Sequence, residues 1–325
     1  AGIKLKQPFK PILNELASLP GVDFAHHENE FVDFDRDRLL FNMVSNEGPC
    51  LCVGDINRDG LDDFYIGGAK GQSGSLYMQK GSGSFSKVSQ ASFDDDKESE
   101  DTGCTFFDAN GDGFQDLYVT SGGNEFSSSS FSLADRLYIS SGGHQFKRSK
   151  QLLPVADKFE STSAVAAQDF DKDGDMDLFV GVRLIPFQYG LPGSGYLLVN
   201  DGKGNFSDRT QFIAPDLKSL GLIKDVEWAD INNDSFVDLV VAGEWMGIKI
   251  FIQESKRFVN RSSEFGLENS NGLYNTIEVS DIDNDGHIDL LAGNHGLNSR
   301  FKATVLEPVS LYVNDFDRNG TIEHI

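Results

Sequence analysis

The chain has 325 residues, of which 39% are hydrophobic and 11% aromatic, so it can bury a large core in one all-β domain and is not intrinsically disordered. Its formal net charge of −23 excludes an extended basic surface, and we expect no nucleic acid or anionic membrane as a partner. No signal peptide, lipidation motif or transmembrane run is present, so direct membrane insertion is not expected.

Residues 1–49 form an N-terminal segment without a repeat pattern. Its prolines limit it to a short helix near residues 12–18, and it is a candidate for an outer strand that closes the fold. His26 and His27 are adjacent and would point apart in an extended chain, which favours solvated or capping roles over metal binding. Residues 31–37 imitate the motif described next but lack its glycine, so we do not expect a metal there.

From residue 50 onward the chain is organised around a nine-residue motif. Its best copy, residues 169–177, reads Asp-Phe-Asp-Lys-Asp-Gly-Asp-Met-Asp, with oxygen-bearing side chains at positions 1, 3, 5 and 9 and glycine at position 6. Calcium takes about six to eight oxygen ligands at about 2.3–2.6 Å, which alternating carboxylates, a bend at glycine and the backbone carbonyl of position 7 can supply. The motif therefore predicts a calcium loop.

The motif occurs six times, and its ligand side chains include 20 of the 51 acidic residues. Six bound dications would add 12 positive charges to the formal −23 and leave about −11, so calcium binding explains most of the acidity. We expect the highest occupancy in the loops that begin at Asp169 and Asp281 and the lowest at Asp315. The predicted ligands at positions 1, 3, 5, 7 (through its backbone) and 9 are Asp55, Asn57, Asp59, Leu61, Asp63; Asp108, Asn110, Asp112, Phe114, Asp116; Asp169, Asp171, Asp173, Asp175, Asp177; Asp230, Asn232, Asp234, Phe236, Asp238; Asp281, Asp283, Asp285, His287, Asp289; and Asp315, Asp317, Asn319, Thr321, Glu323.

The sequence around each loop predicts strands rather than the helices of an EF-hand. In the third repeat we expect strands at 164–170, 177–182, 196–200 and 206–209, with the loop between the first two. Position 2 is apolar in every copy, which indicates that it packs into a core. The first aspartates recur at spacings of 53, 61, 61 and 51 residues, which fits one four-stranded antiparallel unit per repeat. The next spacing is only 34 residues, so the fifth unit lacks or rebuilds its last two strands.

In these motifs the chain resembles the FG-GAP or VCBS repeat family, which includes the propeller of integrin α chains and many bacterial surface proteins. The resemblance covers roughly residues 50–325. It implies a β-propeller of four-stranded blades with calcium between the first two strands of each blade. Such propellers usually have about seven blades, whereas five to six are recognisable here. We therefore expect a truncated C-terminus, and a ring completed by the N-terminal segment, by further domains of a larger parent chain or by a partner.

Cysteine content and the calcium loops bear on the compartment. Cys50, Cys52 and Cys104 are odd in number, and the first two lie two apart on one strand face, where they are badly placed to bridge each other. We expect all three to be small buried residues. Calcium loops of low affinity fill readily only outside the cytosol. The loops therefore favour an extracytoplasmic location, at the cell surface, in the outer envelope or secreted.

Two classes of function compete. No nucleophile elbow, phosphate loop or His-Glu-x-x-His run is present, and a closed oxygen cage offers no open position for a reacting group, so we expect structural calcium ions and no enzyme activity. The alternative to a purely structural role is a calcium ion that bridges to an acidic ligand or a sugar. The leading hypothesis is a surface binding or assembly module for a protein or glycan. The alternative is a calcium-dependent propeller polysaccharide lyase that uses Arg183, Tyr189 or His295.

Connection lengths predict which face binds the ligand. In an antiparallel meander successive connections alternate between the two edges of the sheet, so the calcium loops and the turns before the last strands share one face. The other face carries the long connections 121–134, 183–195 and 294–308. Long loops on a rigid scaffold are the usual sites of recognition, so we predict a ligand face opposite the calcium loops. Its candidate contacts are Arg183, Phe187, Tyr189, Trp245 and Asn298.

Overall fold

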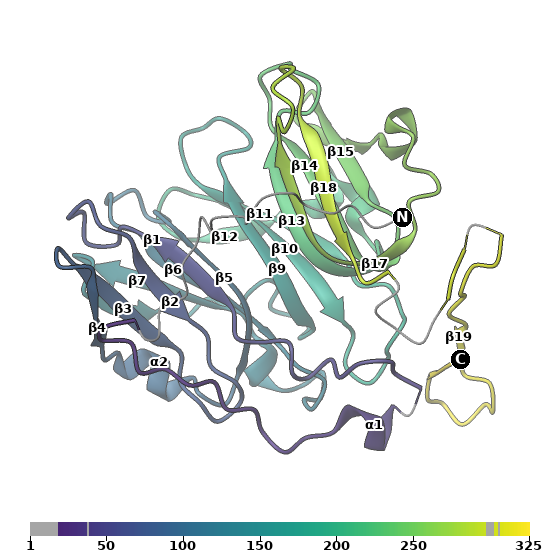
Figure 1. Cartoon of the computed structure of the whole chain (residues 1–325), viewed down its shortest axis with the longest axis horizontal. Coiled ribbons are helices and arrows are strands. Elements are labelled where there is room, and N and C mark those ends of the chain that lie inside the picture. Colours follow the sequence, from purple (N-terminus) through teal and green to yellow (C-terminus); the bar gives the residue numbers. More distant parts are fainter. Residues whose placement is uncertain (1–18, 38, 297–301, 305) are drawn as a thin grey trace, which may run out of the picture.

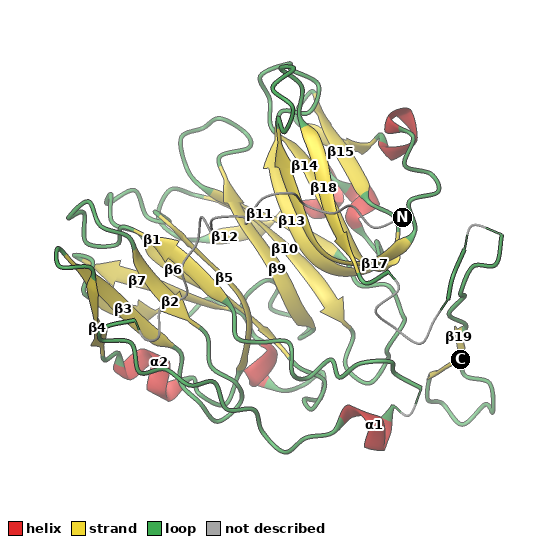
Figure 2. Cartoon of the chain, in the orientation of Figure 1, coloured by secondary structure: helices red, strands yellow, loops and turns green. Residues whose placement is uncertain are grey.

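The computed structural model describes residues 19–37, 39–296, 302–304 and 306–325, and this part of the chain is almost entirely β structure (Figure 1, Figure 2). Its helices are short. They are α1 (Asp33–Arg36), α2 (Ala91–Asp95) and α3 (Thr210–Ile213), with 3₁₀ turns at Phe131–Leu133, Pro215–Leu217 and Ser262–Phe265. The all-β prediction is confirmed.

Four successive blades of four antiparallel strands make up the body of the molecule, and each is a meander in sequence order. The first blade contains β1 (Leu51–Gly54), β2 (Asp63–Ile66), β3 (Ser75–Lys80) and β4 (Ser84–Val88). The second contains β5 (Glu100–Phe107), β6 (Asp116–Gly122), β7 (Arg136–Ser141) and β8 (Gln145–Arg148). The third contains β9 (Ser161–Gln168), β10 (Asp177–Leu184), β11 (Gly195–Asn200) and β12 (Phe206–Asp208). The fourth contains β13 (Leu222–Ala229), β14 (Asp238–Met246), β15 (Lys249–Glu254) and β16 (Arg257–Asn260).

The third blade confirms the strands predicted for it, with shifted ends. The first strand begins and ends earlier than predicted because Asp169 already belongs to the loop, and Gln168 pairs with Asp177 across the loop. The second strand is longer than predicted and runs to Leu184. These differences move Arg183 from the predicted connection into a strand.

Hydrophobic cores fill the spaces between successive blades. Leu178 and Val180 of β10 lie in the core shared with the second blade, whereas Phe179 lies in the core shared with the fourth. This alternation follows from the two-residue period of a strand, and it explains why strands buried on both faces read as continuous apolar runs. The three cysteines are free: Cys52 is buried in the core between the first two blades, and Cys50 and Cys104 pack against it half-buried.

The fifth unit contains only two strands in the described chain, as the short spacing predicts. β17 (Gly272–Ser280) pairs with β18 (Asp289–Asn294) and also with the end of β14, where Glu244 faces Leu273. The last strands, β19 (Val313–Asn314) and β20 (Glu323–His324), form a separate pair. In Figure 1 the first blade and β17–β18 lie at opposite ends of an arc, so the described residues do not close a ring.

The N-terminal segment runs along one edge of the blades rather than within a sheet (Figure 1). Residues 19–37 and 39–49 form no strand, so in this range the predicted ring-closing strand is wrong; the predicted helix at 12–18 lies outside the described residues. The imitation of the motif at 31–37 folds as α1, and its buried Asp33 accepts hydrogen bonds from Ser45 instead of facing other carboxylates. Within the described residues, no helix is long and apolar enough to cross a membrane.

Candidate metal centres

All six predicted loops lie between the first and second strand of their repeat, and position 9 is the first residue of the second strand in every case. The turn places two residues in the left-handed backbone region. In the third loop they are Lys172 at position 4, with φ 62°, and Gly174 at position 6, with φ 98°. Position 6 is glycine in five loops because a left-handed residue without Cβ is unstrained; in the fourth, Ser235 adopts φ 71°. Position 4 is left-handed throughout, which the sequence did not reveal because Arg, Gly, Lys and Asn all occur there.

Backbone N–H groups hold the acidic side chains in each loop. The N–H of position 6 donates to the carboxylate of position 1 in all six loops, at 2.7–3.1 Å. The N–H of position 7 donates to the side-chain oxygen of position 5, at 2.7–3.0 Å. These bonds leave the carbonyl of position 7 free of the strand ladder, as a backbone ligand requires.

The acidic oxygens converge in three of the six loops. In the third, fifth and sixth loops, ligand atoms of three acidic residues lie within 4.8 Å of one another. The groups are Asp169, Asp171 and Asp177; Asp281, Asp283 and Asp285; and Asp315, Asp317 and Glu323. Like charges at this separation repel one another, so the arrangement favours a bound cation.

Position 9 connects the loop to the third strand of the same blade. The carboxylate of Asp177 accepts the backbone N–H of Asn200 at 2.9 Å, and that of Asp116 accepts the N–H of Ser140 at 2.6 Å. Burial, above all, and the neighbouring loop carboxylates together raise the pKa of Asp177 to about 7 and that of Asp116 to about 6. A cation beside these carboxylates would lower both pKa values, because it stabilises the ionised form.

The donor set fits calcium. Asp63 Oδ2, Asp169 Oδ1 and Asp177 Oδ2 are buried oxygens with no hydrogen-bond partner, which costs free energy unless an ion or another ligand meets them. All side-chain donors are oxygens of Asp, Asn or Glu, and no imidazole or thiol takes part, since His287 stands at the position that uses its carbonyl. Hard oxygen donors in a bent loop match Ca²⁺ rather than a transition metal.

Neighbouring loops also contact each other directly. The Lys172 ammonium lies 3.9 Å from the centre of the Phe236 ring in the next loop and donates to the Ser235 carbonyl at 2.6 Å. The Arg58 guanidinium lies over the Phe114 ring in the same way, at 4.8 Å. Position 4 of one loop thus reaches position 7 of the next, and the loops form a continuous row along one face.

Comparisons with known proteins agree with this geometry. The fold is an all-β propeller with blades of antiparallel strands. A family model described as FG-GAP-like repeat matches residues 55–119, 187–241 and 230–292, which together are more than half of the chain, and the chain therefore belongs to the FG-GAP-like repeat family. A solved structure, the Dos1 propeller, is similar with 12% identity and a TM-score of 0.40, over 71% of this chain and 61% of that one. The chain thus spans less than two thirds of that structure. No curated protein sequence matches the chain.

The predicted ligand-face residues fall in different environments. Arg183 is only 2% exposed and donates to Glu47 at 3.1 Å and to Glu244 at 2.9 Å, so the prediction that it belongs to an exposed loop is wrong. Phe187 is 43% exposed in the connection between β10 and β11. The Arg36 guanidinium lies over its ring at 4.3 Å. Asn298 lies outside the described residues.

Tyr189 and Trp245 lie together beside a small cavity. The Trp245 Nε1–H donates to the Tyr189 hydroxyl at 2.9 Å, and both side chains line a cavity of about 190 Å³ with Phe41, Leu311 and His324. Burial raises the pKa of Tyr189 well above its usual range. The contribution of Phe41 could not be anticipated, because it comes from the N-terminal segment and carries no motif.

Proposed function

We propose that this chain is a non-catalytic, calcium-stabilised propeller module that acts outside the cytosol and binds a protein or glycan through the face opposite its calcium loops. The observation that carries the proposal is the recurrence of one loop six times: acidic oxygens converge in the third, fifth and sixth loops, and buried oxygens such as Asp177 Oδ2 have no hydrogen-bond partner in the described residues. Bound calcium would neutralise these carboxylates and fix the connection between the first two strands of each blade.

The extracytoplasmic location rests on the loops as well. The side chain at position 5 is exposed in every loop, as at Asp59, Asp173 and Asp285, so the loops offer calcium sites of the weaker class that fill at millimolar concentration. The presence of three free thiols does not oppose this location, since Cys52 is buried and the thiol pKa values are raised, which keeps them unreactive.

The ligand face is supported by the cavity and by exposed aromatic surface. Phe187 and the cavity beside Tyr189 and Trp245 lie where the long connections meet, at the ends of β10 and β14 that are remote from the loops. An amphipathic aromatic surface of this kind suits a protein side chain or the apolar face of a sugar ring.

A polysaccharide lyase has less support than a binding module. Its candidate cation, Arg183, is neutralised by Glu47 and Glu244 and is buried, so it cannot reach a substrate carboxylate. The raised pKa of the buried Tyr189 hydroxyl makes it a poor general base near neutral pH.

The test is a glycan and surface-protein binding screen with millimolar calcium and with EDTA, followed by two matched substitutions. Phe187→Ala removes an aromatic ring that is 43% exposed on the predicted ligand face, and Phe236→Ala removes one that is 44% exposed on the loop face. We expect Phe187→Ala to weaken binding of the ligand that the screen finds and Phe236→Ala to leave it unchanged. Loss of binding in Phe236→Ala alone would place the ligand face beside the calcium loops.

A further inference from the structure

A second cluster of metal-binding side chains lies outside the calcium loops and contains a histidine. Ligand atoms of His26, Glu28 and Glu100 lie within 4.8 Å of one another. Glu100 is the first residue of β5 and pairs with Gly122 at the end of β6, which places the cluster on the face opposite the loops. The sequence predicts a solvated or capping role for His26; in the structure its ring is half-buried and its Nε2 bonds to Glu28 Oε1 at 2.7 Å.

Four polar atoms in this place are buried without a hydrogen-bond partner in the described part of the chain. They are His26 Nδ1, Glu28 Oε2, Glu100 Oε1 and Glu125 Oε2. Glu100 has no exposed surface at all, so water cannot satisfy its free oxygen from the bulk. An unpaired buried carboxylate oxygen costs about 1–3 kcal/mol or more, and several in one place call for a common partner.

Each of these side chains is held in position by its other polar atom. His26 Nε2 and Glu28 Oε1 bond to each other at 2.7 Å, the Lys70 backbone N–H donates to Glu100 Oε2 at 2.7 Å, and the Asn29 amide donates to Glu125 Oε1 at 2.9 Å. The hydrogen bonds to Glu100 and Glu125 each hold one carboxylate oxygen and leave the second available, as outer hydrogen bonds do at metal sites. His26 Nε2 and Glu28 Oε1 lie close enough to each other to share one bound ion in place of their hydrogen bond.

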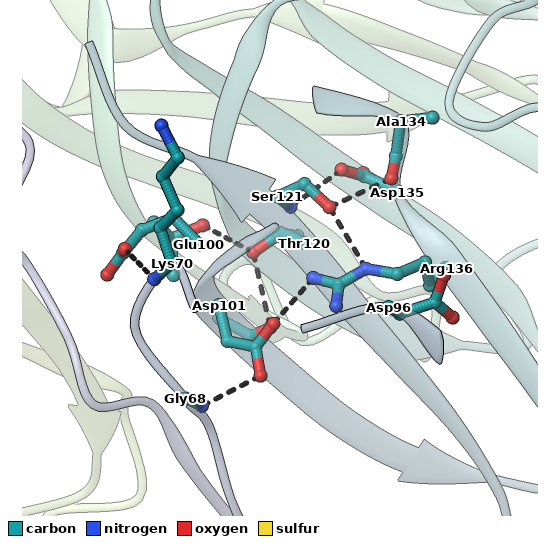
Figure 3. A network of polar contacts seen from close by, with 12 residues as sticks. Gly68, Lys70, Asp96, Glu100, Asp101, Thr120, Ser121, Ala134, Asp135 and Arg136 are labelled. Atoms are coloured by element: carbon teal, nitrogen blue, oxygen red, sulfur yellow. Dashed lines mark hydrogen bonds and ion pairs between the residues drawn. The ribbon is translucent and has the colours of Figure 1, made fainter. Parts of the chain in front are cut away.

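The neighbouring residue shows that an unpaired carboxylate oxygen is specific to Glu100 and not general to this region. Asp101 is equally buried, but its carboxylate accepts from Arg136 at 2.6 Å, from the Tyr65 hydroxyl at 2.7 Å and from the Gly68 N–H at 2.9 Å (Figure 3). The Lys70 side chain does not neutralise Glu100. It extends away from the carboxylate in Figure 3, and its ammonium lies 4.8 Å from the Phe126 ring centre.

Two glycines lie directly against the cluster. A Cβ added to Gly123 would lie 2.4 Å from Glu125 Oε2, and one added to Gly48 would lie 3.2 Å from the His26 ring. The segment that carries the histidine is fixed by Gln72, whose side chain accepts the His27 N–H at 3.0 Å and donates to the Ala25 carbonyl at 2.7 Å. The cluster is therefore built from three parts of the chain that are separately held.

We propose that His26, Glu28 and Glu100 form a site for a divalent first-row transition metal ion such as Zn²⁺ or Co²⁺. The imidazole nitrogen separates this site from the all-oxygen calcium loops, because imidazole suits transition metals whereas calcium takes oxygen. Three protein ligands leave a fourth coordination position for water. The ion would fasten the N-terminal segment to the second blade, a role that goes beyond the proposed ligand binding.

The experiment measures Co²⁺ binding to the full chain by equilibrium dialysis and visible absorption, in buffer with millimolar calcium so that the loops are filled. Wild type is expected to bind one Co²⁺ per chain with a nitrogen-containing ligand spectrum. Removal of a residue that only hydrogen-bonds to a metal ligand weakens metal binding about 10–100-fold. His26→Asn and Glu100→Gln remove the ligands themselves, so each should weaken Co²⁺ binding at least about 100-fold. The matched controls are the exposed neighbours, His27→Asn and Glu98→Gln, which should bind Co²⁺ as wild type does.

The proposal is overturned if wild type binds no Co²⁺ in millimolar calcium. It is also overturned if His26→Asn and Glu100→Gln bind Co²⁺ as tightly as their controls do. His26 lies on a surface segment, so His26→Asn keeps the test valid even if Glu100→Gln fails to fold. A thermal melt in calcium, without Co²⁺, verifies that each variant is folded.

Discussion

The third and the fifth calcium loops have four acidic side chains each at positions 1, 3, 5 and 9, but their surroundings differ. At position 2, Phe170 of the third loop is 2% exposed and its ring lies 5.7 Å from Trp228 and 5.5 Å from Phe258 of the next blade. The equivalent Ile282 of the fifth loop is 57% exposed. The carbonyl of Phe170 also accepts the Gln253 amide at 2.8 Å, so the third loop is fastened to the neighbouring blade by both apolar and polar contacts.

The difference teaches that one motif serves two purposes. Where a complete blade follows, as after the third loop, the loop packs between two blades. Its position-9 carboxylate also accepts a hydrogen bond from the third strand. Around Asp289 the described residues form only two strands, so no third strand among them takes that bond, and the carboxylate accepts the Ile282 N–H at 3.0 Å. The fifth and sixth loops should therefore depend on the cation far more than the first four.

The largest expected effect is that of chelation. A site at about 10 times its Kd contributes about 1.4 kcal/mol, so EDTA should lower the melting temperature by roughly 10 °C relative to millimolar calcium when all six sites empty. Hydrogen exchange sharpens the comparison: amide exchange in EDTA should increase most in residues 281–289 and 315–323 and least in 169–177. An unchanged melting temperature would refute the structural role of calcium, and uniform exchange would refute the distinction between the loops.

The next effect compares position 9 in a complete and an incomplete unit. Asp238 is buried and accepts the N–H groups of Ile231 at 2.9 Å and Gln253 at 2.8 Å, so Asp238→Ala should destabilise the protein by about 2–5 kcal/mol. Asp289→Ala loses the single bond at Ile282 and should cost about 1 kcal/mol. Urea unfolding in saturating calcium measures both. Because each variant loses one ligand, equal costs would mean that the third strand contributes nothing.

A smaller effect is the pH dependence of stability, which should change sign with calcium. Without calcium, the pKa of Asp177 is raised to about 7, above its unfolded value of 3.8, so its stabilisation is complete below that lower value and is lost as the pH rises through about 7. With calcium the carboxylate must be ionised, so binding releases a proton and affinity rises up to about tenfold per pH unit below 7. Melts from pH 5 to 8 in EDTA and in calcium should therefore show opposite slopes. Parallel slopes would contradict the assignment of Asp177 as a ligand.

The loops and the first four blades could be predicted from the sequence because their determinants are local. Nine residues specify each turn, and the two-residue period and the spacing of the repeats specify the strands. Residues whose environment depends on distant contacts could not be assigned. Arg183 looks like a loop residue until Glu47, 136 residues earlier, pairs with it in a buried position. His26 looks solvated until the fold brings Glu100 to it. In both cases one member of the pair comes from the N-terminal segment, which carries no repeat to fix its register.

The smallest expected effect concerns position 6, where the fourth loop differs from the other five. Ser235 has φ 71°, a left-handed conformation that costs a non-glycine residue about 1 kcal/mol or more. Ser235→Gly removes this strain but also gives the unfolded chain more conformational entropy, which opposes folding. The net effect should be a stabilisation of about 0.5–1 kcal/mol. Gly286→Ser is the matched reverse change, because a Cβ added there meets no atom within 4 Å and its cost is that of the backbone alone. The urea midpoint should rise in the first variant and fall in the second, with unchanged slopes. If Ser235→Gly instead lowers the midpoint, the Ser235 side chain stabilises its loop by more than the strain of its backbone, and glycine at position 6 of the other loops then reflects something other than conformation.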